Sequence, residues 1–157
     1  LAADLVSKHV AFAVLGRGSP PHRVEVIPGL LDLRLSTNPG IVFGITALPG
    51  WTVLAATAVA MVAVVVLFAT SPPGRKVLHV ALALILAGAA GNAYDRLFSD
   101  VDLPELGRRT GEVRDFIDLH VGSYHWPTFN LPDVWLVVGV VAILVMTLLS
   151  RPEREGH

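Results

Sequence analysis

The stretch from Val113 to Trp135 holds three carboxylates that could carry acid–base chemistry, Asp115, Asp118 and Asp133. Two carboxylates a few ångströms apart share a proton, so one can act as a base and the other as an acid. That combination can activate water against an amide bond. Asp133 follows Pro132 and precedes an apolar run, which predicts a position at the start of a helix, where the helix dipole favours its charged form. The spacing leaves both Asp115 and Asp118 open as its partner, and either could instead cap a turn.

Two other hydrolytic mechanisms have less support in the same stretch. His120 and His125 could join the aspartates in a divalent-metal site. However, the sequence has no HExxH motif, and histidines in an aromatic surface segment are more often interfacial, so we expect no metal. Ser123 follows Gly122, but the GxSxG pattern of serine hydrolases is absent.

The composition is that of a membrane protein. The chain has 157 residues, of which 53% are hydrophobic, and its mean hydropathy is +0.61. We expect a single domain covering residues 1–157, with further residues upstream because the chain does not begin with Met. The formal net charge of −1 shows no basic excess that would indicate a nucleic-acid partner. Cysteine is absent, which excludes disulfides, thiol nucleophiles and thiolate metal sites.

Four apolar segments predict an α-helical polytopic membrane protein with four transmembrane helices. The expected spans are about 1–15, 51–70, 77–98 and 134–150. The connecting segments 16–50 and 99–133 are polar. Within the first of them, LLDLRL alternates apolar and polar residues, which predicts a small β-sheet on the membrane surface. The sequence Asn38-Pro39-Gly40 then indicates a turn.

Basic residues mark one side of the predicted bundle. Arg75 and Lys76 lie in the short connection 71–76, and Arg151 and Arg154 lie in the C-terminal tail. The positive-inside rule therefore places this connection and both termini in the cytoplasm, and the two polar segments outside. The three aspartates then lie at the outer membrane boundary, where acidic groups are costly and are functional candidates.

Polar residues also occur inside two of the predicted spans. Asp4 and Lys8 are four residues apart in the first span, so they should share a helix face as a structural ion pair. Asn92, Asp95 and Arg96 share one face near the outer end of the third span and must face protein or a wet cavity. Asp95 could be a polar latch between helices or a functional group, whereas Asn92 and Arg96 can donate hydrogen bonds to a substrate carbonyl. Small residues in the same span, including Gly88 and Gly91, permit close helix contact.

Five sequence blocks occur in order along the chain. They are DLVSK at 4–8, IPGLLDLRLSTNPGIVFG at 27–44, GNAYDR at 91–96, VRDFID at 113–118 and FNLPD at 129–133. Together they resemble bacterial lipoprotein signal peptidase, the signal peptidase II family of membrane aspartic peptidases. The segment between Arg96 and Asp115 is longer than we expect for most members, which leaves the shape of the external lid open. Pro132 also stands where alanine is common.

The resemblance implies a function and a set of site residues. A member removes the signal peptide from diacylglyceryl-modified prolipoproteins, cutting before the lipidated cysteine, without a metal or organic cofactor, and is sensitive to the cyclic peptide globomycin. It is expected to be a monomer in contact with phospholipid in the bacterial cytoplasmic (inner) membrane, with its active site on the periplasmic face. The family's catalytic aspartates correspond to Asp115 and Asp133. The supporting residues would be Asn38, Gly40, Asn92, Asp95, Arg96 and Asn130, with Asp4 and Lys8 in the first span.

Two other functions compete with this interpretation. A proton or cation carrier would place its acids near mid-membrane and often shows repeated halves, whereas here the acids are expected at the outer edge and no repeat is found. A metal-dependent hydrolase using the His and Asp cluster would lose activity with a chelator.

Overall fold

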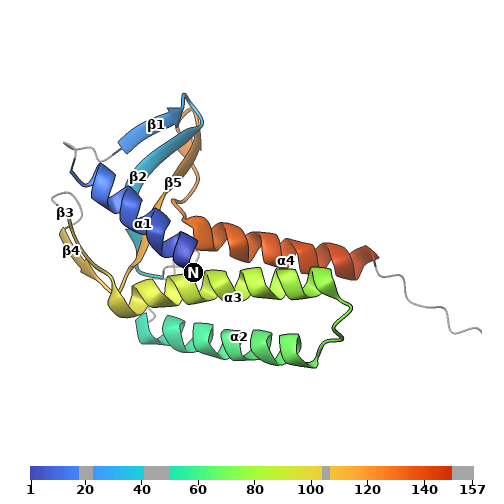
Figure 1. Ribbon diagram of the computed structural model, residues 1–157. Helices are drawn as coiled ribbons and strands as arrows, with labels where there is room; N and C mark the ends of the chain where they lie inside the picture. The colour runs from blue at the N-terminus through green and yellow to red at the C-terminus, as the bar shows by residue number, and fades with distance from the viewer. Residues whose placement is uncertain (18–22, 41–49, 104–106, 150–157) are drawn as a thin grey trace, which may run out of the picture.

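The computed structural model describes residues 1–17, 23–40, 50–103 and 107–149. Figure 1 shows three helices, α2, α3 and α4, side by side, with the β-strands gathered at one end of them. The helices are α1 (Ala2–Leu15), α2 (Gly50–Thr70), α3 (Lys76–Phe98) and α4 (Leu131–Leu149). The strands are β1 (Arg23–Ile27), β2 (Leu31–Asn38), β3 (Asp100–Leu103), β4 (Gly107–Thr110), β5 (Val113–Val121) and β6 (Tyr124–His125).

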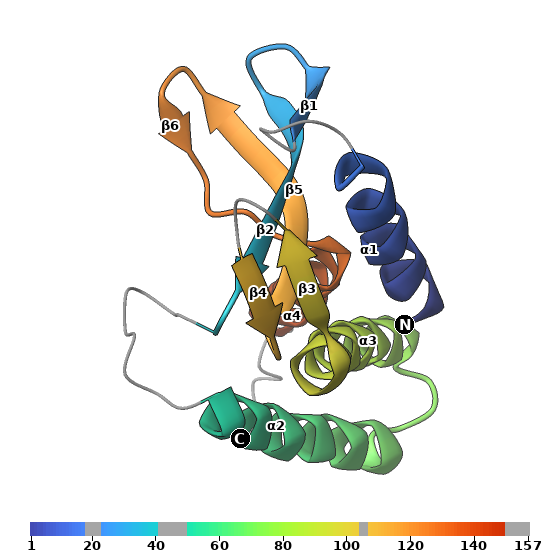
Figure 2. The same ribbon diagram turned by 90° about the vertical axis from the view of Figure 1, so that its left-hand side faces the viewer.

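Three of the described helices, α2, α3 and α4, are long and apolar enough to cross a membrane. Their bounds agree closely with the predicted spans 51–70 and 77–98. Helix α4 begins three residues before the predicted 134, because Pro132 is tolerated in the first helical turn. Helix α1 has 14 residues, about 21 Å, which is shorter than a hydrocarbon core of about 30 Å. Its N-terminal end lies close to α3, and the helix then tilts away from α3 toward β1 (Figures 1 and 2). The predicted span 1–15 stays a prediction.

Helices α3 and α4 approach each other closely at glycines. A Cβ atom at Gly88 would lie 2.6 Å from the carbonyl oxygen of Pro132, and one at Gly139 would lie 2.7 Å from the carbonyl oxygen of Ala81. Both distances are too short for a real Cβ, so only glycine permits this separation of the helices. The prediction of close contact at Gly88 is confirmed. The contact fixes how the outer end of α3 faces the start of α4.

An antiparallel sheet with strand order β1-β2-β5-β6 packs beside α1, as Figure 2 shows. The strand predicted at LLDLRL is confirmed as part of β2. Strand β2 pairs with β5 so that Asp32 lies opposite Asp118 and Ser36 lies opposite Asp115, with an irregularity between these two pairs. The sheet therefore carries Asp115 to the end of the helical bundle.

The longer segment between Arg96 and Asp115 contains a separate hairpin, formed by β3 and β4. Arg108 on β4 donates two hydrogen bonds to Asp100 on β3, at 2.6 and 3.1 Å. These hydrogen bonds lower the pKa of the Asp100 carboxyl. Val101 is buried, whereas both charged partners are exposed to solvent. The sequence analysis did not predict these strands, although Asp100-Val101-Asp102-Leu103 alternates polar and apolar residues; β4, GRRT, shows no such alternation.

Candidate active site

Asp115 lies on β5 with only 1% of its surface exposed. The side-chain amide of Asn130 donates a hydrogen bond to its carboxylate at 2.6 Å, and Asn38 at the end of β2 hydrogen-bonds the same group. Asp115 is thus held between the main sheet and the residue that precedes α4. Both partners are neutral amides.

Asp133 lies in the first turn of α4, as its position after Pro132 predicts. Its carboxylate accepts a hydrogen bond from the Asn92 side chain at 2.8 Å and another from the backbone N–H of Asn130 at 3.1 Å. The backbone N–H of Asp133 donates in return to the side chain of Asn130 at 3.1 Å. This reciprocal pairing resembles a capping box, so the same contacts start the helix and orient the carboxylate.

Two asparagines connect the two aspartates. Asn130 donates to Asp115 and also to the side-chain oxygen of Asn92 at 3.1 Å, while Asn92 donates to Asp133. Asn92 comes from α3, Asp115 from β5, and Asp133 from α4. Residues far apart in the sequence thus form one hydrogen-bonded group, with Asn130 completely buried at its centre.

The surroundings of Asp115 favour a retained proton. Burial raises the pKa of Asp115 to about 7, and the nearby negative charge of Asp133 adds to the shift, while the hydrogen bond from Asn130 opposes it. An ordinary aspartate titrates near 3.9. Near neutral pH, Asp115 is therefore close to half protonated.

A second polar cluster lies next to this group and is held by cations. Lys8 lies 3.0 Å from Asp4 and 3.0 Å from Asp95, and all three side chains are completely buried. Arg114 donates to Asp95 through its guanidinium at 2.7 and 3.1 Å. The predicted Asp4–Lys8 ion pair is confirmed. Asp95 joins α3 to α1 and β5, which is the arrangement expected of a polar latch. The sequence analysis missed Arg114, although its charge directly before Asp115 was a usable signal.

The two clusters are in contact. Lys8 donates a hydrogen bond to the side-chain oxygen of Asn92 at 3.2 Å. Because that oxygen accepts from Lys8 and Asn130, the amide nitrogen of Asn92 is oriented toward Asp133. The ion pairs therefore help to orient the group that holds the carboxylate.

The predicted turn at Asn38-Pro39-Gly40 is confirmed. The backbone N–H of Gly40 donates to the side chain of Asn38 at 2.8 Å. Gly40 has a φ of +96°, a conformation that favours glycine. A Cβ at this position would also lie 3.7 Å from the guanidinium of Arg96. Arg96 is half-buried and donates to the backbone oxygen of Asn92 at 3.4 Å, so this turn and α3 meet beside the aspartates.

Asp118 and the two histidines form a different group. Asp115 and Asp118 are three residues apart on an extended strand, so their side chains point to opposite faces. Asp118 lies 3.0 Å from His125, and His120 lies 2.9 Å from Asp32. Among the described residues, no group of three or more His, Asp or Glu side chains has an arrangement that could hold a metal ion.

The sequence matches a family described as signal peptidase (SPase) II over residues 1–149. The chain belongs to the signal peptidase II family. It is accordingly an aspartic-type endopeptidase, which agrees with a site built from two carboxylates. The resemblance found in the five sequence blocks is confirmed.

Relatives in this family match nearly the whole chain. A protein of Francisella tularensis subsp. novicida named lipoprotein signal peptidase is 31% identical, covering 96% of this chain and 88% of the relative. A protein of Aquifex aeolicus with the same name is 32% identical, covering 98% of this chain and 83% of the relative. A solved structure of a bacterial membrane enzyme is similar with a TM-score of 0.78 and 30% identity, covering 99% of this chain and 88% of that one.

Proposed function

We propose that this signal peptidase II removes the signal peptide from diacylglyceryl-modified prolipoproteins, with Asp115 and Asp133 as its catalytic pair. The observation that carries the proposal is the hydrogen-bonded path from Asp115 through Asn130 and Asn92 to Asp133. It brings two carboxylates together through neutral donors. A carboxylate pair without a cation between its members can hold one proton and one negative charge, as amide hydrolysis by water requires.

The two aspartates differ in the charge that their surroundings favour. Asp133 accepts two N–H donors and lies at a helix N-terminus, where a negative charge is stabilised. Asp115 is more deeply buried and carries the raised pKa. In the proposed reaction Asp133 takes a proton from water as the water oxygen attacks the scissile carbonyl carbon. Asp115 gives its proton to the carbonyl oxygen.

The second step returns both groups to their starting state. Asp133 gives the proton to the peptide nitrogen, and Asp115 recovers a proton from a hydroxyl of the tetrahedral intermediate as the carbon–nitrogen bond breaks. Asn38, Asn92 and Asn130 hold the carboxylates during these transfers. The guanidinium of Arg96 can donate to a backbone carbonyl of the substrate. Gly40 supports the turn beside it, and Asp4, Lys8 and Asp95 position α1 and β5 against α3.

We place the site at the outer, periplasmic face of the bacterial inner membrane. The strands and both aspartates lie at one end of α2, α3 and α4, and the short connection with Arg75 and Lys76 lies at the other (Figure 1). Basic residues favour the cytoplasmic side. The tail with Arg151 and Arg154 lies outside the described residues. The exposed apolar faces of α2 and α4 would contact membrane phospholipid, and we propose a monomer.

The proposal is tested with purified enzyme and synthetic precursor peptides in a bilayer. A diacylated precursor should be cut far faster than the same peptide with a free cysteine, because acyl chains add about 0.8 kcal/mol of membrane anchoring per buried methylene. Globomycin should block the cleavage. Equal rates with and without the lipid would contradict the proposed substrate, and cleavage that a chelator stops would contradict the metal-free mechanism.

A further inference from the structure

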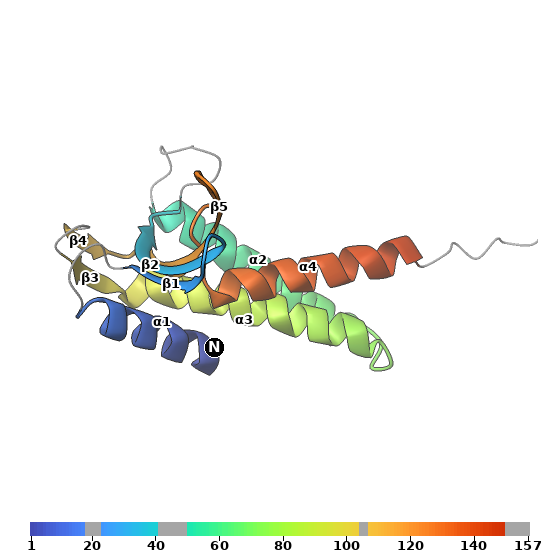
Figure 3. The same cartoon turned by 90° about the horizontal axis from the view of Figure 1, so that it is seen from above.

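Two hollows meet where α3 starts and α4 ends, at the end of the helices opposite the strands (Figure 3). The smaller one, which we call the basic hollow, has a volume of about 360 Å³ and is lined by Gly74, Arg75, Lys76, Val77 and Met146. The larger one, which we call the apolar groove, has a volume of about 760 Å³ and follows one face of α4 from Leu149 back to Val137. Val77 and Met146 line both hollows, so the two are continuous.

The basic hollow carries positive charge that no neighbouring carboxylate offsets. Arg75 and Lys76 are both exposed. The sequence has no Asp or Glu between residues 33 and 94, and none between residues 134 and 149. Helix α2, the first half of α3 and α4 beyond its first turn therefore bring no acidic side chain to this end. The hollow suits an anion, and Arg and Lys side chains are common partners of phosphate.

The apolar groove has the length of one leaflet of a membrane. Twelve residues separate Val137 from Leu149, which is about 18 Å along the helix axis. A hydrocarbon core of about 30 Å gives each leaflet about 15 Å. The side chains at both ends of the groove, Val137 and Leu149, are exposed. An acyl chain that starts at the basic hollow can therefore lie in the groove over its full depth in one leaflet.

The two hollows together call for a ligand that joins an anionic group to a long apolar chain. An anionic phospholipid has both parts in this order, and basic residues at a membrane surface attract it. The signal peptide of a substrate does not fit, because the segment before its apolar core is positively charged and Arg75 and Lys76 would repel it.

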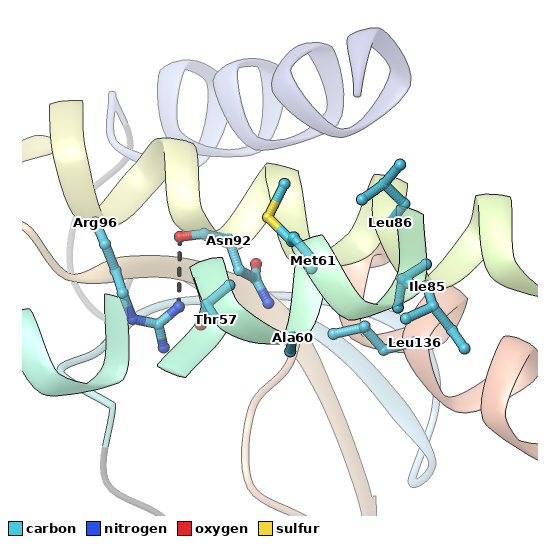
Figure 4. Close-up of a pocket in the computed structure, with 10 residues that line it drawn as sticks. Thr57, Ala60, Met61, Ile85, Leu86, Asn92, Arg96 and Leu136 are labelled. Carbon is cyan, nitrogen blue, oxygen red and sulfur yellow. Dashed lines mark hydrogen bonds between the residues drawn. The ribbon is translucent and has the colours of Figure 1, made fainter. Parts of the chain in front are cut away.

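The enclosed cavity between α2 and α3 is not an alternative site for this ligand. Figure 4 shows Arg96 at one end of that cavity and the apolar side chains of Ile85 and Leu136 toward the other. Its volume is about 220 Å³, below the range of about 300 to 1,000 Å³ that drug-sized ligands occupy. Neither Arg75 nor Lys76 lines it.

We propose that the basic hollow and the apolar groove bind one anionic phospholipid, with its phosphate against Arg75 and Lys76 and one acyl chain along α4. The proposed function supplies only the leaflet, which is the cytoplasmic one. The lipid site itself depends neither on the substrate nor on the aspartates.

Native mass spectrometry of the full chain in detergent tests the site, with phosphatidylglycerol as the probe. One phosphatidylglycerol should stay bound to the unaltered protein, with an affinity about tenfold or more above that for phosphatidylethanolamine with the same acyl chains, whose headgroup has no net charge. Glycerol phosphate, which lacks the chains, should not stay bound. Phosphatidylglycerol should also raise the Tm, because it binds the folded state.

Two variants remove the two parts of the site separately. Replacing both cations, Arg75→Gln with Lys76→Gln, should lower the affinity for phosphatidylglycerol by about tenfold or more and abolish the preference over phosphatidylethanolamine. The matched control is Arg108→Gln with Arg109→Gln, which removes the same charge from exposed residues of β4 and should change neither.

Ala142→Trp fills the apolar groove and should weaken binding of both lipids equally. Ala58→Trp makes the same change on an exposed part of α2 that lines neither hollow, and it should leave both affinities unchanged. Should Ala142→Trp fail to fold, the two charge variants decide the matter, because their side chains are exposed.

The outcomes distinguish this inference from the proposed function, since lipid binding is measured without a substrate. Equal binding of the two lipids, or equal losses in the Arg75/Lys76 and Arg108/Arg109 variants, would overturn the site. A protein that binds no lipid but forms a dimer that Ala142→Trp disrupts would show that a second copy covers the groove, which also overturns it. A raised KM for the precursor in the Arg75/Lys76 variant, with phosphatidylglycerol binding unchanged, would assign the groove to the signal peptide instead.

Discussion

Two buried carboxylates that lie near each other, Asp95 and Asp115, have different surroundings. Asp95, completely buried, is held by Lys8 at 3.0 Å and by Arg114 at 2.7 Å. Asp115, almost equally buried, accepts from the neutral amide of Asn130 and has the charge of Asp133 nearby. Depth of burial is thus nearly the same, and the difference lies in the charge of the partners.

This difference decides what each carboxylate can do. Asp95 pairs with Lys8 on α1 and with Arg114 on β5, so it links three elements. The amide of Asn130 donates a hydrogen bond without supplying a charge. Burial and the negative charge of Asp133 therefore favour the protonated form of the Asp115 carboxyl. The contact between Lys8 and Asn92 lets the ion-paired cluster orient the amide that holds Asp133. The cationic partners of Asp95 suit a structural role, whereas the neutral partner of Asp115 suits the proposed acid–base role.

The largest expected effect is loss of cleavage when either Asp115 or Asp133 is changed, the two aspartates that are connected through Asn130 and Asn92. Asp115→Asn and Asp133→Asn keep the size of the side chain but remove the ionisable group, and each should lower kcat by roughly 10⁴-fold or more. The double variant should be no worse than either single one, because the two groups act as a unit. Single-turnover cleavage of a diacylated precursor measures this. Losses that multiply in the double variant would show that the two aspartates act independently.

The ion-paired cluster should respond mainly in stability. Asp95→Asn leaves Lys8 and Arg114 without their buried carboxylate and should lower the free energy of unfolding by about 3–5 kcal/mol. Cleavage per folded molecule should fall far less than it does in Asp115→Asn. Thermal unfolding in detergent, measured beside cleavage, checks both statements. Asp100→Asn is the matched control, because its pair with Arg108 is exposed and the midpoint should barely move. Abolished cleavage with normal stability would move Asp95 into the catalytic group.

A smaller effect concerns stability as a function of pH. The folded protein retains the proton of Asp115 up to about pH 7, whereas the unfolded chain loses it near 3.8. The folded state binds more protons between these values, so this group makes the wild type less stable as the pH rises through them. Asp115→Asn lacks that contribution. Its Tm relative to wild type should therefore increase by several degrees between about pH 4 and about pH 8. A constant difference in Tm would mean that Asp115 is not buried with a proton.

Several features of the fold and site follow from local sequence. The alternation in LLDLRL predicted β2, the position of Asp133 after Pro132 predicted a helix start, and the spacing of Asp4 and Lys8 predicted their ion pair. Each depends on residues that are close in the chain. Local periodicity and turn chemistry are sufficient for such features.

Other features depend on contacts between distant segments. The residues alone could not choose between Asp115 and Asp118, because the choice depends on the strand that places them on opposite faces. The pairing of Asp95 with Arg114 and the path through Asn92 and Asn130 join segments that only the fold brings together. Among the site residues, the catalytic roles of the aspartates came from the family resemblance and remain a proposal.

The smallest expected effect is that of Asp118→Asn. Asp118 is buried, but its partner His125 is partly exposed and Arg34 is largely exposed, at 3.0 and 4.0 Å. These partners can turn to solvent, so the loss of stability should be smaller than for Asp95→Asn. Cleavage should stay within a fewfold of the wild type, because Asp118 faces away from Asp133. A loss of activity as large as that of Asp115→Asn would show that the wrong aspartate has been assigned.

The central claim is that Asp115, which is linked to Asp133 through Asn130 and Asn92, holds a proton near neutral pH. Infrared titration of the purified enzyme from about pH 5 to about pH 9 measures this directly, since a protonated carboxyl and a carboxylate absorb at different frequencies. We predict a protonated carboxyl that is lost near pH 7, that is absent in Asp115→Asn and that is unchanged in Asp118→Asn. The same signal persisting in Asp115→Asn, or disappearing in Asp118→Asn, would contradict the account.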